Sequence, residues 1–503
     1  MKGQRSRLLK GAAWVSAANI LINLLGLVSL FLLTRLLVPE DFGLVAIATA
    51  LAEIIGVVTE LTLASALVQR RTIEPVHFDT AWTLNVLRAS VVAVLFFLIS
   101  SPFAQFYGDD RLALIVQVLA FATFVGGFRN PRLILFKREL DFSKTFIMQV
   151  TNKVSAFIAT VGVAVAFQSY WALIAGITVS AVATVIMSYL IIPYKPRFAL
   201  AAWRDLLSFS IWITLGRWVQ ALNWRAQPLL FGFVLPTSIL GQYNVSQRLL
   251  GKVIEQAVQP IQGLLFPAFS RLQDQAERLR RGYIRSQGTM CLITFPIACG
   301  FALLAEDLVI LTIGEQWLPA ATLIQFSAVI RMLQTVENVN ALAMATANTK
   351  ALFFRDLLAF FIRWPLIIAG LLLGGDTPFE RLTGALASQI IAVAITTLWN
   401  MRLISRISTV AIRDHAALAW RSLASVLAMS AVVLTAQSVA PVASDWWSLA
   451  VRVSALSTLG AATYFGALYV IRILKGRDES VEHELAIIVR DMATKVIAKA
   501  RAN

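Results

Sequence analysis

Charged side chains are scarce in this sequence. Asp, Glu, Lys and Arg make up 14% of its 503 residues, whereas a soluble domain with a solvated surface has about 25%. This shortage excludes an ordinary soluble globular protein. Cysteine is also rare: Cys291 and Cys299 lie in one apolar stretch without the spacing of metal ligands, so we expect two small buried side chains. We predict no metal centre and no cofactor.

Motifs of catalysis are missing as well. No Gly-x-x-x-x-Gly-Lys-Ser/Thr phosphate loop occurs in the sequence, which argues against an intrinsic ATPase. The three histidines, His77, His415 and His483, are isolated in predicted cytoplasmic loops or in the tail, and no predicted loop is long enough to fold as a catalytic domain. We therefore expect that the protein is not an enzyme.

Long apolar stretches fill most of the chain instead. Apolar residues make up 58% of the sequence, and the mean hydropathy is +0.74. The stretches are about 20 residues long, the length that an α-helix needs to cross roughly 30 Å of hydrocarbon. The pattern predicts an all-α, polytopic membrane protein with about 14 transmembrane helices. The expected spans are 11–34, 43–67, 82–100, 112–129, 145–167, 171–192, 206–234, 241–269, 287–305, 319–341, 357–374, 383–401, 420–440 and 448–472.

Basic residues accumulate in alternate loops, as they do on the cytoplasmic side of bacterial membrane proteins. If the N-terminus is inside, the predicted outer loops carry only Arg35, Arg111 and Arg381, and nearly all other loop Lys and Arg residues lie inside. The asymmetry predicts a multi-pass protein of the bacterial inner membrane with both termini in the cytoplasm. It also accounts for most of the formal charge of +16, so we expect no nucleic-acid partner.

A Pro-turn-Gly pattern occurs twice. Val38-Pro39-Glu40-Asp41-Phe42-Gly43 follows the first span, and Leu235-Pro236-Thr237-Ser238-Ile239-Leu240-Gly241 follows the seventh, about 197 residues later. The repetition predicts two pseudo-symmetric six-helix lobes around a central cleft, with two extra C-terminal helices. The expected parts are residues 1–200 for the N-terminal lobe, 201–405 for the C-terminal lobe, 406–475 for the extra helix pair, and 476–503 for an amphipathic cytoplasmic tail that either contacts the membrane or is disordered.

Several ionisable side chains lie inside predicted spans, where each needs a partner, a hydrated cavity or a function. Four residues of span eight recur at helical spacing on one face: Arg248, Lys252, Glu255 and Gln259. We predict a substrate site from the cations Arg217, Arg225, Arg248, Lys252 and Arg331. They outnumber the nearby Glu255 and Glu337, and guanidinium groups bind phosphate oxygens bidentately, so the surplus favours a cavity that receives an anion. We expect Arg225, Arg248 and Lys252 to form its centre, with Arg217 and Arg331 deeper. For any single cation, an ion pair that only holds helices together is the alternative.

A second polar group lies mostly in the first half. Glu53 and Glu60 are seven residues apart on one face of span two, and the 197-residue interval places Asn23 opposite Gln220. These carboxylates form a proton or sodium site, or they hydrogen-bond helices together; both interpretations stay open. The predicted coupling or cavity residues are Asn19, Asn23, Glu53, Glu60, Gln220 and Glu255. We expect Arg88 and Lys153 to reach the membrane surface, and kinks at Pro228, Pro260, Pro267, Pro296 and Pro365.

Three segments carry a resemblance to a known family: Gly11-Ala-Ala-Trp14 after a basic start, Leu33-Thr-Arg-Leu-Leu-Val-Pro-Glu-Asp-Phe-Gly43, and Gln259-Pro-Ile-Gln-Gly-Leu-Leu-Phe-Pro-Ala-Phe-Ser-Arg271. The chain resembles the Wzx-type flippases, the polysaccharide transporter branch of the multidrug/oligosaccharidyl-lipid/polysaccharide exporter superfamily, in the colanic-acid and succinoglycan exporter-like subgroup. The resemblance covers roughly residues 5–475. It implies alternating access, and export of undecaprenyl-diphosphate-linked oligosaccharide repeat units from the cytoplasmic to the periplasmic leaflet, for exopolysaccharide or lipopolysaccharide synthesis. It also implies that the cavity cations receive the diphosphate.

Other functions remain open at this stage. A lipid II flippase or an ion-coupled multidrug antiporter shares the architecture, although a drug-cation exporter is expected to have an acidic cavity. A membrane polysaccharide polymerase normally has a large outer loop with catalytic residues, and every predicted outer loop here is short. The expected partners are the lipid-linked oligosaccharide, membrane lipids, H⁺ or Na⁺ as the coupling ion, and polysaccharide polymerase machinery.

The predicted orientation can be tested with topology reporters. A reporter fused after Tyr194 or Arg280 should report the cytoplasm, and one fused after Asp109 or Asp376 should report the periplasm. Opposite signals at these four sites would overturn both the orientation and the number of spans.

Overall fold

The protein is described here by a computed structural model, which covers residues 19, 21–60, 63, 67, 73–139, 142–203, 211–440 and 445–475. These residues form helices joined by short connections, and no strand occurs among them. The predicted fold class, an all-α polytopic membrane protein, is confirmed. The predicted tail, residues 476–503, lies outside the described residues.

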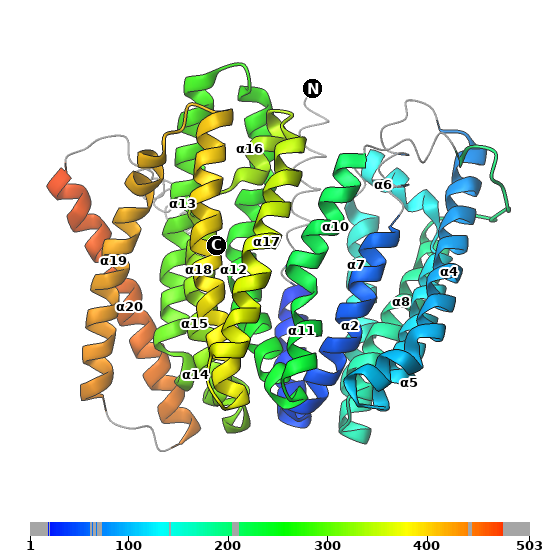
Figure 1. Ribbon diagram of the computed structural model, residues 1–503, viewed down its shortest axis with the longest axis horizontal. Coiled ribbons are helices and arrows are strands. Elements are labelled where there is room, and N and C mark those ends of the chain that lie inside the picture. The colour runs from blue at the N-terminus through cyan, green and yellow to red at the C-terminus, as the bar shows by residue number, and fades with distance from the viewer. Residues whose placement is uncertain are drawn as a thin grey trace, which may run out of the picture. The chain divides into compact units, whose positions relative to one another are not determined.

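The chain forms two compact units, of which the first comprises residues 1–245. Its elements are the helix Leu21–Leu36, α2 (Pro39–Thr59), α4 (Pro75–Tyr107), α5 (Arg111–Gly127), η1 (Pro131–Leu133), α6 (Ile134–Glu139), α7 (Phe142–Phe167), α8 (Trp171–Ile191), α10 (Ile211–Arg225), α11 (Gln227–Val234) and the beginning of α12 (Thr237–Leu272). α4 packs against α5, α5 against α8, and α8 against α7, and both α10 and α11 lie along α2 (Figure 1).

The second unit comprises residues 246–503. Besides the rest of α12, its elements are α13 (Ala276–Leu303), α14 (Ala305–Thr312), η2 (Glu315–Trp317), α15 (Pro319–Thr335), α16 (Val339–Ala345), α17 (Thr349–Leu373), α18 (Pro378–Ile407), α19 (Ile412–Val439) and α20 (Trp446–Lys475). α17 packs against α18, α19 against α20, and α13 against both α15 and α19. α6, α14 and η2 lie in segments for which the sequence predicts loops. The predicted lobe boundaries at residues 200 and 405 stay predictions.

All fourteen predicted spans overlap helices, but fewer have the length and apolarity to cross a membrane. In the described part of the chain, nine helices are long and apolar enough, and two shorter apolar helices match spans one and four. Spans seven and ten are each broken into two helices, α10 with α11 and α15 with α16. Span eight is α12, which carries charges along one face. The number fourteen is therefore not confirmed, and the three exceptions are the spans that hold the predicted substrate-binding cations.

The polar residues at the start of α2 attach this helix to its neighbours. Pro39 is the first helical residue, where a missing N–H loses no hydrogen bond. Asp41 Oδ1 accepts a hydrogen bond from the backbone N–H of Tyr170, which precedes α8 (3.2 Å). Glu40 Oε1 lies 2.6 Å from Nη2 of Arg111, the first residue of α5. The first Pro-turn-Gly motif therefore connects α2 to the adjacent ends of α5 and α8.

Arg111 also closes the turn between α4 and α5. Gly108 ends α4 with φ 68°, a left-handed conformation that suits glycine. Arg111 Nη2 then lies 2.7 Å from Asp109 Oδ2, and this hydrogen-bonded guanidinium holds the pKa of the Asp109 carboxyl below its usual value. Because the folded-state pKa is lowered, the contact stabilises the turn at neutral pH and is lost as the pH falls through that pKa.

The two Pro-turn-Gly motifs pack against each other inside the first unit. A Cβ atom on Gly43 would lie 1.8 Å from the carbonyl oxygen of Thr237, and one on Gly241 would lie 1.7 Å from that of Pro39. Each glycine thus meets the carbonyl four residues before the other glycine. This reciprocal contact supports the duplication inferred from the sequence, and it requires glycine on both helices because no side chain fits between the two backbones.

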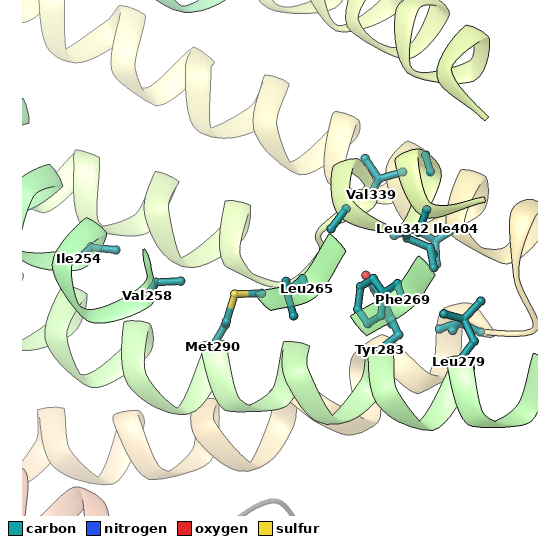
Figure 2. Close-up of a cluster of buried hydrophobic side chains, with 14 of the residues drawn as sticks. Ile254, Val258, Leu265, Phe269, Leu279, Tyr283, Met290, Val339, Leu342 and Ile404 are labelled. Atoms are coloured by element: carbon teal, nitrogen blue, oxygen red, sulfur yellow. The ribbon is translucent and has the colours of Figure 1, made fainter. Parts of the chain in front are cut away.

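A buried cluster holds α12, α13, α16 and α18 of the second unit together (Figure 2). The completely buried Tyr283 is its largest member. The Tyr283 hydroxyl accepts a hydrogen bond from the backbone N–H of Asn338 (3.2 Å) and lies 3.3 Å from Nε2 of His415. The interpretation of His415 as an isolated loop residue was wrong, because this ring is buried at the start of α19.

The glycine contact predicts the effect of a single methyl group. Gly43→Ala and Gly241→Ala should each lower the free energy of unfolding by about 1–3 kcal/mol, the usual range for overpacking. Gly56→Ala, also in α2, is the matched control, because a Cβ atom there has nothing within 4 Å. Thermal unfolding of the purified variants measures the effect, and equal midpoints for Gly43→Ala and Gly56→Ala would contradict the contact.

Candidate functional site

Two ion pairs join α2 to α10 in the first unit. Arg225 Nη1 lies 2.8 Å from Glu53 Oε2, and Arg217 forms an ion pair with Glu60. The helices are antiparallel here, because the earlier carboxylate pairs with the later guanidinium. The four side chains are between 36% and 53% exposed. α2 and α10 therefore present a ladder of two ion pairs at their common surface.

This arrangement brings together two groups that the sequence analysis assigned to different roles. Arg217 and Arg225 were predicted to bind substrate, and Glu53 and Glu60 to bind a coupling ion. The paired residues are 157 and 172 positions apart in the sequence, so helical spacing could not reveal the pairs. Glu60 also differs in its local structure, since it is the C-terminal cap of α2 with extended backbone rather than a residue within the span.

Two cations that we expected at the membrane surface lie against other helices of the first unit. Arg88 Nη1 on α4 is 3.5 Å from the hydroxyl oxygen of Thr59, next to Glu60. Lys153 on α7 directs its ammonium group toward Gly26, where a Cβ atom would lie 3.8 Å from Nζ. The sequence shows only that both residues are cations within predicted spans. Their direction, into the first unit, is seen only in the fold.

The other predicted polar residues of the first unit are more scattered. Asn19 and Asn23 are helical and half-buried, and the side chain of Gln220 on α10 is exposed. The 197-residue interval relates Asn23 to Gln220 in the sequence, but no hydrogen bond between these two residues is described in the structure. Their role in a cavity stays a prediction.

The second unit carries its cations on one face of α12 and on α15. Arg248, Lys252, Glu255 and Gln259 are all exposed, as the helical spacing predicts. Lys252 Nζ lies 3.4 Å from Glu255 Oε2, and both side chains are more than half exposed. Arg331 reaches α12 from α15: a Cβ atom on Gly251 would be 3.6 Å from its Nη2. The small residue between Arg248 and Lys252 thus makes room for a third cation.

Helix breaks accompany both sets of charges. α10 ends at Arg225 and α11 begins at Gln227, so the break predicted at Pro228 is confirmed. α15 ends at Thr335, four residues after Arg331, and α16 begins at Val339. Pro260, Pro267, Pro296 and Pro365 lie inside continuous helices. The predicted centre of the site, Arg225 with Arg248 and Lys252, draws on both units and stays a prediction.

An apolar hollow in the first unit does not match the predicted site. It has a volume of about 630 Å³ and lies among α5, α7 and α8. Its lining residues are uncharged and include Val118, Phe167, Trp171 and Thr178. It therefore offers no cationic side chain to an anionic group.

Comparisons with known proteins agree on one family and one fold. The family described as polysaccharide biosynthesis protein matches residues 32–322. The chain is 28% identical over 372 residues to the lipopolysaccharide biosynthesis protein WzxC of Escherichia coli K12, covering 73% of this chain and 75% of that protein. It is 24% identical over 290 residues to the succinoglycan biosynthesis transport protein ExoT of Rhizobium meliloti, covering 57% and 58%.

Among solved structures, the fold is similar to that of the lipid II flippase MurJ in an inward-closed conformation. The TM-score is 0.70 at 13% sequence identity, and the match covers 91% of this chain and 98% of MurJ. At this identity the likeness is one of fold alone.

The ion-pair ladder can be tested by exchanging its charges. Glu53→Arg should destabilise the first unit, because it places two guanidinium groups together, and adding Arg225→Glu should restore stability. The coupling energy from the double-mutant cycle should be about 0.5–1.5 kcal/mol, as for other pairs in membrane proteins. Combining Glu53→Arg with Arg217→Glu is the mismatched control. Rescue by the mismatched exchange equal to that by the matched one would rule out the specific pairing.

Proposed function

Because the chain belongs to the family of polysaccharide biosynthesis proteins, we propose that it is a flippase that carries undecaprenyl-diphosphate-linked oligosaccharide repeat units across the bacterial inner membrane. The cargo moves from the cytoplasmic to the periplasmic leaflet, where repeat units are used for exopolysaccharide or lipopolysaccharide synthesis. The names of the relatives support this assignment, since WzxC is a lipopolysaccharide biosynthesis protein and ExoT is a succinoglycan transport protein.

The observation that carries the proposal is the charged face of α12. Arg248 and Lys252 are exposed on a helix whose opposite face is buried in the apolar core. An ionised side chain in contact with hydrocarbon is costly, so this face borders water. Arg331 approaches the same stretch of α12. Arg248, Lys252 and Arg331 thus gather at one stretch of α12, and guanidinium groups donate bidentate hydrogen bonds to phosphate oxygens such as those of a diphosphate.

The ion pairs of the first unit have a different role in the proposed cycle. Arg217 and Arg225 already form ion pairs with carboxylates. Their charge is therefore balanced before any cargo binds. A diphosphate that reached them would compete with Glu60 and Glu53. The carboxylates therefore act as internal anions that occupy the cations when no cargo is bound, and they limit how tightly the cargo is held.

Three other functions have a membrane-embedded helical architecture. A multidrug antiporter moves organic cations and needs a site with surplus carboxylates, whereas α12 and α15 present surplus cations. A lipid II flippase would recognise the same diphosphate, so the diphosphate site does not distinguish the two cargoes. A polymerase would need catalytic groups in a water-accessible loop, and the connections between described helices are short. We therefore place the protein among transporters rather than enzymes.

Its location and partners follow from the cargo. The substrate is made on the cytoplasmic face and is polymerised outside, so the flippase acts in the inner membrane alongside the polymerase machinery. Both termini are assigned to the cytoplasm by the distribution of basic residues. The coupling ion is H⁺ or Na⁺.

Removal of Arg248 tests the proposed binding surface. Arg248→Ala should weaken binding of an undecaprenyl-diphosphate oligosaccharide by about 1.5–3 kcal/mol, the value of a hydrogen bond to a charged group. Arg248→Lys keeps the charge and loses the bidentate geometry, so it should have an intermediate Kd. Glu255→Gln should strengthen binding, because it removes the competing carboxylate beside Lys252.

Protein abundance and thermal stability are measured alongside the Kd as a control. If Arg248→Ala inserts normally and binds the lipid as tightly as the parent protein, Arg248 only holds helices together, and the α12 face is not the diphosphate site.

A further inference from the structure

The second unit contains a partly buried carboxylate that the proposed cargo site does not use. Glu337 lies between α15 and α16, in a short non-helical segment, Val336–Asn338. Its Oε1 accepts a hydrogen bond from Asn400 Nδ2 on α18 (2.7 Å), and its Oε2 accepts one from the backbone N–H of Val339 (2.9 Å). In the described part of the chain, no Lys, Arg or His forms an ion pair with it. Both described hydrogen bonds to the carboxylate therefore come from neutral donors.

Side chains from α13 hold the broken backbone around Glu337. Gln287 and Cys291 both donate to the carbonyl oxygen of Thr335, the last residue of α15. Tyr283 accepts from the backbone N–H of Asn338. Backbone groups freed by a helix break inside a membrane need such partners. The break is thus a built feature of the fold, and it presents Glu337 toward α18.

Asn400 provides the second observation. Its side chain is 6% exposed, and one end of the amide donates to Glu337. The other end, Oδ1, is buried without a hydrogen-bond partner. A buried carbonyl oxygen that lacks a donor is costly. The carboxylate can bind a proton and the unpaired amide oxygen can accept a hydrogen bond, so the missing component is a hydrogen-bond donor or a small cation.

The two charged groups that act on Glu337 from α17 have opposite signs and pair with each other. Arg355 on α17 acts on Glu337 with the opposite charge, and Asp356 acts with the same charge. These two residues pair with each other at 2.9 Å, and Arg355 Nη2 also donates to Asn340 Oδ1 (2.7 Å). The titratable or charged groups that act on Glu337 from the neighbouring elements are Tyr283 on α13 and Arg355 and Asp356 on α17.

Apolar side chains enclose this polar group on the side of α12 and α16. Figure 2 shows Tyr283 with Val339, Leu342 and Ile404 in one cluster, and its hydroxyl oxygen on the side of α16. The enclosure limits the number of water molecules that could solvate a negative charge, so protonation is the direct way to remove the charge.

We propose that Glu337 is a proton-binding carboxyl of the second unit, and that Asn400 changes its hydrogen bond when the proton binds. In the ionised state the Asn400 amide nitrogen donates to Oε1. When Glu337 takes up a proton on Oε1, the amide turns over and Oδ1 accepts the new O–H. The proton thus supplies the donor that Oδ1 lacks. This reaction involves one proton and no other reactant.

The proposal bears on transport through the helix break. Glu337 binds α18 through Asn400 and the start of α16 through Val339, so a proton that changes the first bond alters how α16 is held against α18. Its use as the coupling step rests on the proposed flippase function. Proton binding itself requires no cargo and is tested separately.

Infrared spectroscopy of the purified full-length protein tests the binding step. A pH titration should show the C=O stretching band of one protonated carboxyl that is absent from Glu337→Gln and retained in Glu306→Gln. Glu306 is the matched control because it is an exposed glutamate of the same unit. Asn400→Ala should retain the band at a shifted frequency, because the carboxyl has lost its hydrogen-bond partner. If Glu337→Gln fails to fold, this shift in Asn400→Ala still decides the question.

The same titration distinguishes a proton from a metal cation. Adding Na⁺ in place of choline at constant pH should leave the band unchanged. Loss of the band on adding Na⁺ would assign the site to a metal cation and overturn the proposal, as would an unaltered band in both Glu337→Gln and Asn400→Ala.

Transport in vesicles tests the coupling step. Glu337→Gln should bind the lipid diphosphate as the parent protein does, and its transport should no longer respond to an imposed pH gradient. A retained response would exclude Glu337 as the coupling carboxyl. If the parent protein itself moves no lipid-linked oligosaccharide, the proposed function fails, while the infrared result for Glu337 stands.

Discussion

The cost of a charged side chain in hydrocarbon is the constraint on which the rest of this structure depends. Although the chain has few charged residues, several lie inside its helices. Each group of them avoids contact with hydrocarbon in a different way. Glu53 and Glu60 pair with Arg225 and Arg217 across two helices. The charges of α12 lie on one exposed face. Glu337 is held by neutral hydrogen-bond donors in a helix break. These three solutions divide the polar groups into paired, solvated and enclosed sets, which the proposed transport cycle uses differently.

The low dielectric of the hydrocarbon also makes unpaired backbone N–H and C=O groups costly. A break in a helix frees N–H and C=O groups that water cannot reach, and the break persists only where side chains replace the lost bonds. Between α15 and α16, Gln287, Cys291 and Tyr283 supply those bonds from α13. The side chains that stabilise the break also fix the position of Glu337, so the local irregularity and the partly buried carboxylate form one structural unit.

Close backbone contact at the start of α2 and α12 has a different physical basis. No charge is involved, and the contact depends on the absence of side chains at Gly43 and Gly241. The surrounding residues of the first motif stabilise the approach through hydrogen bonds and an ion pair to the ends of α5 and α8. Two copies of one helix-start motif can therefore pack with reciprocal geometry, as expected of a duplicated element.

Local composition over about 20 residues is sufficient to predict the helical, membrane-spanning class and most of the helix positions. The sequence by itself also determined that Arg248, Lys252, Glu255 and Gln259 share a face of α12, since helical spacing is a local property. The ion-pair and hydrogen-bond partners of the polar side chains depend instead on tertiary packing. Glu53 and Arg225 are 172 residues apart, and His415 and Tyr283 are 132 apart, so no periodicity relates them. The break after α15 contains no proline or glycine, and its partners lie on α13 and α18, which the sequence could not place beside it. Pairing and burial depend on which helices become neighbours, and this is settled by packing of the whole unit rather than by any local pattern.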